Sequence, residues 1–90
     1  MAKASVDPAE LRRFAAELNH FNVELEGLLS GLNARLRALE QSWRDQEQRK
    51  FAGEFEQTVK VFGGFLENSR RHVAFLAKKA ALAEEYLKQR

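Results

Sequence analysis

Apolar residues that recur at alternating steps of three and four run through both halves of this chain, and they constrain its fold more than any other feature. In the first half they are Leu11, Phe14, Leu18, Phe21, Leu25, Leu28, Leu32, Leu36, Leu39 and Trp43. In the second half they are Phe51, Phe55, Val59, Phe62, Leu66, Val73, Leu76, Ala80, Ala83 and Leu87. This spacing places each set on one face of an α-helix. The sequence therefore predicts two long amphipathic helices whose apolar stripes face each other.

Helix start signals precede both stripes. Asp7 can cap a helix that begins at Pro8, and Glu10 completes a capping box with Asp7. A second capping box pairs Asp45 with Gln48 in the polar stretch between the stripes. We therefore expect one domain over residues 1–90, with a first helix at about 8–42, a turn at about 43–46 and a second helix at about 47–88. A turn this short makes the helices antiparallel, so the predicted fold class is an all-α two-helix hairpin.

A second apolar row on the 47–88 helix indicates that the chain associates. Its members are Val61, Phe65, Phe75, Leu82 and Tyr86. One partner helix cannot cover this row together with the first stripe, and burying each large apolar side chain contributes about 1.5–3 kcal/mol. Cysteine is absent, so disulfides cannot compensate for a small core. We expect two hairpins to form a four-helix bundle, a homodimer in preference to a heterodimer, with an interface that includes Leu25, Leu29, Leu36, Val61, Phe65, Phe75 and Leu82.

Gly63 and Gly64 lie inside the second predicted helix. Each glycine costs a helix about 1 kcal/mol relative to alanine. Two interpretations stay open: the pair marks a kink or hinge, or it is tolerated at a point of close helix packing.

Residues that carry chemistry are sparse. The chain has two histidines and no cysteine, and no motif for a nucleophile, a phosphate loop or a metal site surrounds them. We therefore predict no enzymatic activity, no cofactor and no metal. The net charge of +2 comes from cations that alternate with acids along the chain, which does not favour nucleic-acid binding. No apolar run approaches the roughly 20 residues that span a bilayer, so we expect no stable membrane insertion.

The first five residues lead into the helix start without an apolar signal core. We expect the protein to be made in the cytoplasm and to be secreted, if at all, without a cleaved signal peptide. Trp43, the single tryptophan, lies at the end of the first stripe, where its ring can cover Leu39 and Phe51.

Three features together give the chain a resemblance to a known family. Residues 6–11 open a long helix, residues 39–45 place the lone tryptophan at the midpoint, and a second long helix follows. The chain resembles the WXG family, the small early-secreted-antigen-like substrates of type VII secretion, over nearly its whole length. Two positions depart from the family pattern: Asp45 replaces the glycine of Trp-x-Gly, and Tyr86 is followed four residues later by Arg90 in place of an acid.

The resemblance implies a dimer that is exported in folded form or that carries other proteins to the secretion machinery. Its partner would be a second copy or a WXG-type paralogue, with the secretion-system ATPase as a further partner. The residues that the machinery would contact are Trp43, Arg44, Asp45 and Tyr86. The alternative is an intracellular helical dimer that acts as an adaptor or chaperone module.

Overall fold

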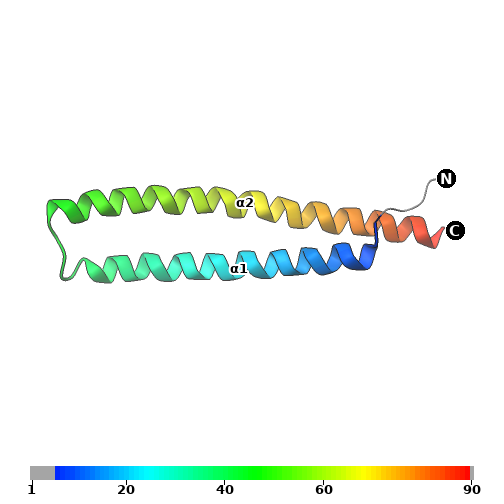
Figure 1. The fold of residues 1–90 in the computed structure, drawn as a ribbon, viewed down its shortest axis with the longest axis horizontal. Coiled ribbons are helices and arrows are strands. Elements are labelled where there is room, and N and C mark those ends of the chain that lie inside the picture. The colour runs from blue at the N-terminus through cyan, green and yellow to red at the C-terminus, as the bar shows by residue number, and fades with distance from the viewer. Residues whose placement is uncertain (1–5, 90) are drawn as a thin grey trace.

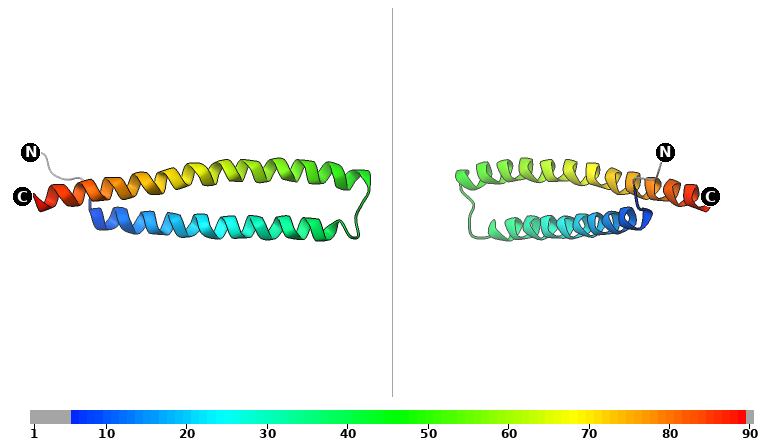
Figure 2. Two further views of the ribbon diagram at one scale, coloured as in Figure 1. Left: turned by 180° about the vertical axis from the view of Figure 1, so that it is seen from behind. Right: turned by 45° about the vertical axis from the view of Figure 1, so that its right-hand side comes forward.

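The computed structural model describes residues 6–89, which form two long α-helices joined by a short turn. Helix α1 spans Pro8–Leu39 and helix α2 spans Gln46–Lys88. They run antiparallel and side by side in every view (Figures 1 and 2). We call the end that holds the turn the turn end, and the opposite end, where α1 begins and α2 finishes, the open end. The molecule measures 68 × 17 × 13 Å, and the predicted all-α hairpin is confirmed.

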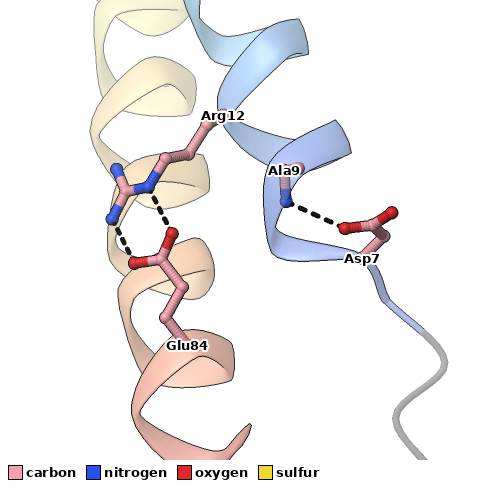
Figure 3. A network of polar contacts seen from close by, with 4 residues as sticks. All are labelled: Asp7, Ala9, Arg12 and Glu84. Atoms are coloured by element: carbon pink, nitrogen blue, oxygen red, sulfur yellow. Dashed lines mark hydrogen bonds and ion pairs between the residues drawn. The ribbon is translucent and has the colours of Figure 1, made fainter. Parts of the chain in front are cut away.

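Both helices begin at the aspartates that were predicted as caps. Asp7 accepts a hydrogen bond from the Ala9 N–H at 2.9 Å (Figure 3). Asp45 accepts one from the Gln48 N–H, also at 2.9 Å. Asp45 has φ of −94° and ψ of −172°, which is extended backbone. The residue that replaces the family's glycine therefore starts α2 as its cap, and it needs no left-handed conformation.

The second hydrogen bond of each predicted capping box, from the N–H of the cap residue to the side chain three residues later, is not found among residues 6–89. The Glu10 carboxylate accepts a hydrogen bond from Arg13 at 2.7 Å, because a charged donor one turn along the helix outcompetes a backbone N–H. The Gln48 side chain is buried and donates across the turn end to Glu40, at 3.5 Å.

Helix α1 ends at Leu39, three residues before the predicted boundary at position 42, and α2 begins one residue early. The Leu39 carbonyl accepts hydrogen bonds from the N–H groups of Ser42 and Trp43, each at 3.0 Å. The bond from Ser42 spans three residues, which tightens the backbone into a 3₁₀-like turn. The apolar stripe continues to Trp43, but this residue already belongs to the turn.

The helices meet along a continuous seam of buried and half-buried residues. On α1 the seam includes Leu11, Ala15, Leu18, Asn22, Leu25, Leu29 and Leu36. On α2 it includes Gln48, Ala52, Phe55, Val59, Leu66, Ser69, Val73, Leu76, Ala80 and Ala83. Both sets keep the three-four spacing, as expected of two helices packed along a seven-residue repeat.

Only some residues of the two predicted stripes lie in the seam. Half of the α1 stripe is exposed, because small Ala15 and polar Asn22 take seam positions where the helices approach closely. On α2 only three stripe residues are exposed, and small Ser69 and Ala80 are buried in the seam. The stripe residues left outside the seam are Phe14, Phe21, Leu28, Leu32, Leu39, Phe51, Phe62 and Leu87.

A polar pair lies in the middle of this seam. Asn22 is 1% exposed, and its Oδ1 accepts a hydrogen bond from the Ser69 hydroxyl at 2.8 Å. The Nδ2 of Asn22 is also buried and has no hydrogen-bond partner among residues 6–89. A buried donor without a partner costs about 1–3 kcal/mol, so this layer lowers the stability that the seam would otherwise provide.

Helix α2 continues without a break through Gly63 and Gly64. A Cβ added at either position would meet no neighbouring atom within 4 Å. The predicted close crossing at these glycines is therefore absent within residues 6–89. Within the same residues, neither helix combines the length and the apolar character needed to cross a membrane.

Candidate functional site

One side of the hairpin is closed by polar contacts between the helices. Arg12 donates two hydrogen bonds to the Glu84 carboxylate, at 2.7 and 2.8 Å (Figure 3). The Nη2 of Arg70 lies 3.0 Å from the Oε1 of Glu26. Near the turn, Glu40 accepts a hydrogen bond from the Gln48 side chain. We call this side the polar flank.

The Arg12–Glu84 pair changes the charge behaviour of both groups. The two hydrogen bonds that Arg12 donates lower the pKa of the Glu84 carboxyl. The same bonds raise the pKa of the Arg12 guanidinium. Both ions are therefore held charged, although the pair is open to water and its net contribution to stability is small.

The opposite side carries large apolar residues. Phe14, Phe21 and Leu28 are spaced seven residues apart on α1, and each directly precedes a seam residue. Arg12 and Glu26 each directly follow one. In helices paired along a seven-residue repeat, residues at these two kinds of position lie on opposite sides of the seam.

Contacts with α2 show which of its residues share this apolar side. The rings of Phe21 and Phe65 meet edge to face, with centroids 6.3 Å apart. Phe51 lines one hollow together with Leu32 and Leu39. We call this side the apolar flank; its exposed residues are Phe14, Phe21, Leu28, Leu32, Leu39, Phe51 and Phe65.

The second row predicted on α2 is exposed at every position. Val61 is 71% exposed and Phe75 is 63% exposed, while Phe65, Leu82 and Tyr86 are also open to solvent. Phe65 belongs to this row and to the apolar flank, so the two surfaces join on α2. Exposed apolar surface of this kind is typical of sites that bind a partner protein, a ligand or a membrane.

The turn end of the apolar flank is aromatic and hollowed. The rings of Trp43 and Phe51 lie 6.0 Å apart, and Phe51 and Phe55 stack at 5.9 Å. Beside them is a hollow of about 200 Å³. Its lining is almost wholly apolar and consists of Leu32, Arg35, Leu36, Leu39, Phe51 and Phe55.

The residues predicted to contact the secretion machinery fall into two places. Trp43 is half-buried against Phe51 as expected, and the Arg44 Nε donates to the Glu40 carbonyl at 3.0 Å. Asp45 is used as the cap of α2, whereas Tyr86 is exposed at the open end. Within one chain the hairpin therefore separates Tyr86 from the turn by most of its length. Arg90 lies outside the described residues.

The residues predicted for the dimer interface also divide. Val61, Phe65, Phe75 and Leu82 are exposed, as an interface requires before association. In contrast, α1 contributes Leu25, Leu29 and Leu36, which are half-buried along the seam.

Two features were missed by sequence reasoning. Phe14, Phe21 and Leu28 were assigned to the stripe that faces α2; their seven-residue spacing marks a separate row, but it does not show which row lies in the seam. Asn22 was overlooked because it is polar, yet it lies four residues after Leu18 and three before Leu25, in step with the seam.

The exposed apolar residues offer a surface that another apolar surface can cover. Within residues 6–89, no three His, Asp or Glu side chains come together as a metal site would require. The chain has two pairs of adjacent arginines at 12–13 and 70–71, and all four lie within 4 Å of carboxylates: Arg12 with Glu84, Arg13 with Glu10, Arg70 with Glu26 and Arg71 with Glu67.

Comparison with known proteins gives one match. The sequence model of the WXG100 family, described as proteins of 100 residues with WXG, matches residues 3–85. No curated protein and no solved structure matches the chain. Members of the matched family are small helical hairpins that are generally substrates of type VII secretion, and the family is not known as enzymatic. Because the match extends over almost the whole chain and the structure has the corresponding two-helix form, this chain belongs to the WXG100 family.

Proposed function

We propose that this protein is a non-catalytic substrate or carrier of a type VII secretion system and that it acts as a dimer. The observation that carries the proposal is the apolar flank, which one hairpin leaves uncovered on a protein of a secreted family. Two such flanks packed together would bury them in a four-helix bundle. The partner is a second copy of the chain, and a WXG-type paralogue would present a similar flank.

The dimer has two further requirements that the hairpin meets. The apolar flank and the second row are continuous through Phe65, so one interface can cover both. The polar flank lies on the opposite side of the seam and would stay in water. Dimer formation would therefore not carry the free-energy cost of removing its ion pairs from water.

Recognition by the secretion machinery is assigned to the two ends of the hairpin. Trp43 and Arg44 shape the turn, while Tyr86 stands exposed near the end of α2. These groups offer aromatic and cationic contacts to a partner such as the secretion ATPase. Export then proceeds without a cleaved signal peptide and without any reaction at the protein itself.

Expression in cells with an intact type VII apparatus tests the secretion step. The chain should accumulate in the culture medium and should stay in cells that lack the secretion ATPase. Trp43→Phe retains an aromatic contact with Phe51, and Tyr86→Ala removes an exposed ring; each should lower the exported amount at least about tenfold without loss of helicity. If neither the wild-type chain nor its variants reach the medium, the secretion role is disproved.

Light scattering on the purified chain tests the dimer separately. At micromolar concentration the measured mass should be twice that of one chain. A folded species with the mass of one chain would show that the apolar flank serves another purpose.

A further inference from the structure

The buried pair Asn22 and Ser69, which we call the polar layer, is a costly element in a seam of mostly apolar residues. The Ser69 hydroxyl donates to the Asn22 Oδ1 at 2.8 Å, while the buried Asn22 Nδ2 has no partner among residues 6–89. In paired helices, a single buried asparagine specifies the register at a cost in stability. The polar layer is therefore placed to do the same between α1 and α2.

The apolar part of the seam specifies the register weakly, because its α1 side repeats. Leucine recurs every seven residues, at positions 11, 18, 25, 32 and 39. Sliding α2 along α1 by seven residues brings seam positions opposite these leucines again. The slide would break the Arg12–Glu84 and Arg70–Glu26 ion pairs, but exposed pairs of this kind contribute little to stability. Leucine packing and surface charge alone therefore do not decide how the helices align.

The observed register can be followed along the whole seam from the polar layer. In an antiparallel pair of helices, the residue numbers of two seam residues at the same level have a constant sum. Asn22 contacts Ser69, so Leu36 lies level with Phe55. These two residues line the same hollow at the turn end, which agrees with this alignment.

One alternative register pairs the apolar stripes more fully than the observed one. If α2 slides by seven residues in the direction that lengthens α1, Leu32 comes level with Leu66, and Leu36 comes level with Phe62. In the observed register Leu32 is 46% exposed and Phe62 is 39% exposed. The slide would place both side chains opposite large apolar partners. Burial of apolar surface therefore favours this slide.

The polar layer opposes the same slide. It would bring Asn22 level with Leu76 and Ser69 level with Leu29. Each polar side chain would then be buried against leucine without the hydrogen bond that joins the two in the observed register. The cost of the polar layer is therefore smallest in the register that the hairpin adopts.

We propose that the polar layer sets the register of the hairpin and thereby keeps Trp43 in the turn. A slide of seven residues is shared between the two helices, so α1 would gain about one turn and α2 would lose one. Trp43 would become the end of α1 and would leave the Phe51 ring, whose centroid lies 6.0 Å from its own. The cap at Asp45 also favours the observed register, so a test must change the layer and keep Asp45. This role belongs to a single hairpin and goes beyond the proposed dimer and its secretion.

Two spin labels, one on each helix, report the register. Ala16→Cys and Gln57→Cys give exposed attachment sites, and the native chain has no cysteine to interfere. Pulsed electron paramagnetic resonance measures the distance between the labels. Dilution of the labelled chain into an excess of unlabelled chain restricts the signal to pairs within one hairpin. At ~1.5 Å per residue, the slide would lengthen this distance by about 10 Å.

Removal of the polar layer should release the slide. Asn22→Leu combined with Ser69→Ala should move most molecules to the longer distance, whereas the wild-type layer should give the shorter distance alone. Asn22→Ala combined with Ser69→Ala removes the same polar groups with smaller side chains and should give the same shift. Circular dichroism checks that each variant stays helical. A distance that remains at the wild-type value in both helical variants would overturn the proposal.

Two control variants distinguish the polar layer from a general loosening of the seam. Leu66→Ala opens the seam but retains the layer, so it should keep the wild-type distance. Asn22→Ser combined with Ser69→Asn exchanges the two polar residues and should also keep it. A lengthened distance in Leu66→Ala equal to that of the layer variants would overturn the role of the layer, because loss of packing would then be sufficient for the slide.

Discussion

The polar and apolar flanks are built on the same two helices, but they leave the chain in opposite states. On the polar flank Arg12 meets Glu84 and Arg70 meets Glu26, so its charges are paired within one hairpin. On the apolar flank Phe14 and Leu28 remain more than half exposed, and nothing among residues 6–89 covers them. The polar flank is complete in a single hairpin, whereas the apolar flank is not.

This difference shows how two helices can fold and still retain binding energy. Exposed ion pairs contribute little to stability, and they tolerate water. Each large apolar side chain that moves out of water contributes about 1.5–3 kcal/mol. The energy available for association is therefore concentrated on one side of the seam, and this asymmetry decides which side of the hairpin a partner covers.

The strongest test of the comparison places a charge on the apolar flank. Phe65→Asp should raise the dimer dissociation constant at least about 100-fold, because the carboxylate would be desolvated without a cationic partner. Asn19→Asp adds the same charge next to a seam residue on the polar side and should leave association unchanged. Sedimentation equilibrium on both variants gives the measurement, and equal effects would show that the flanks are equivalent.

A second test separates the seam from the flank. Leu66 is 4% exposed, so Leu66→Ala should lower the free energy of unfolding by about 2–4 kcal/mol at any protein concentration. Leu28 is 68% exposed, so the effect of Leu28→Ala should appear only where the dimer is populated. Urea unfolding at several protein concentrations distinguishes them. A concentration-dependent effect at Leu66 would contradict the assignment of this residue to the hairpin core.

A third, smaller effect is expected from the polar layer inside the seam. Ser69→Ala leaves both polar atoms of the Asn22 amide without a partner and should lower the free energy of unfolding by about 1–2 kcal/mol. Asn22→Leu combined with Ser69→Ala removes the polar groups together and should restore the wild-type value or exceed it. Thermal unfolding measures both. A double variant less stable than Ser69→Ala would show that the layer stabilises the hairpin.

Much of this architecture was predictable because local rules and global packing agree. The two stripes define the helices, and Asp7 and Asp45 cap them as their positions indicate. The contact of Trp43 with Phe51 and the exposure of the second row were also predicted correctly. In each case residue type and spacing point to a single arrangement.

The division between seam and flank was not predictable in the same way. On α1, two adjacent faces are apolar enough to face α2, and spacing alone does not rank them. The structure buries the face with Ala15 and Asn22, because smaller side chains let the helices approach and pack densely. The larger Phe14 and Phe21 are left outside, and the hollow at the turn end depends on that choice.

The weakest expected effect comes from the polar flank and concerns pH. Hydrogen bonds from Arg12 lower the pKa of Glu84, so the folded state favours the charged carboxylate. This stabilisation is present above the unfolded-state pKa of about 4.3 and is lost as the pH falls through the lower folded-state value. Glu84→Gln should therefore cause the smallest loss of thermal stability in this set at pH 7, and the difference from wild type should vanish once the pH lies below the lowered folded-state pKa of Glu84. Glu85→Gln changes a neighbouring carboxylate for which no ion pair is found among residues 6–89, so it serves as the control. A loss that stays constant as the pH falls from 7 into the acidic range would mean that Glu84 acts through packing of its side chain and not through its charge.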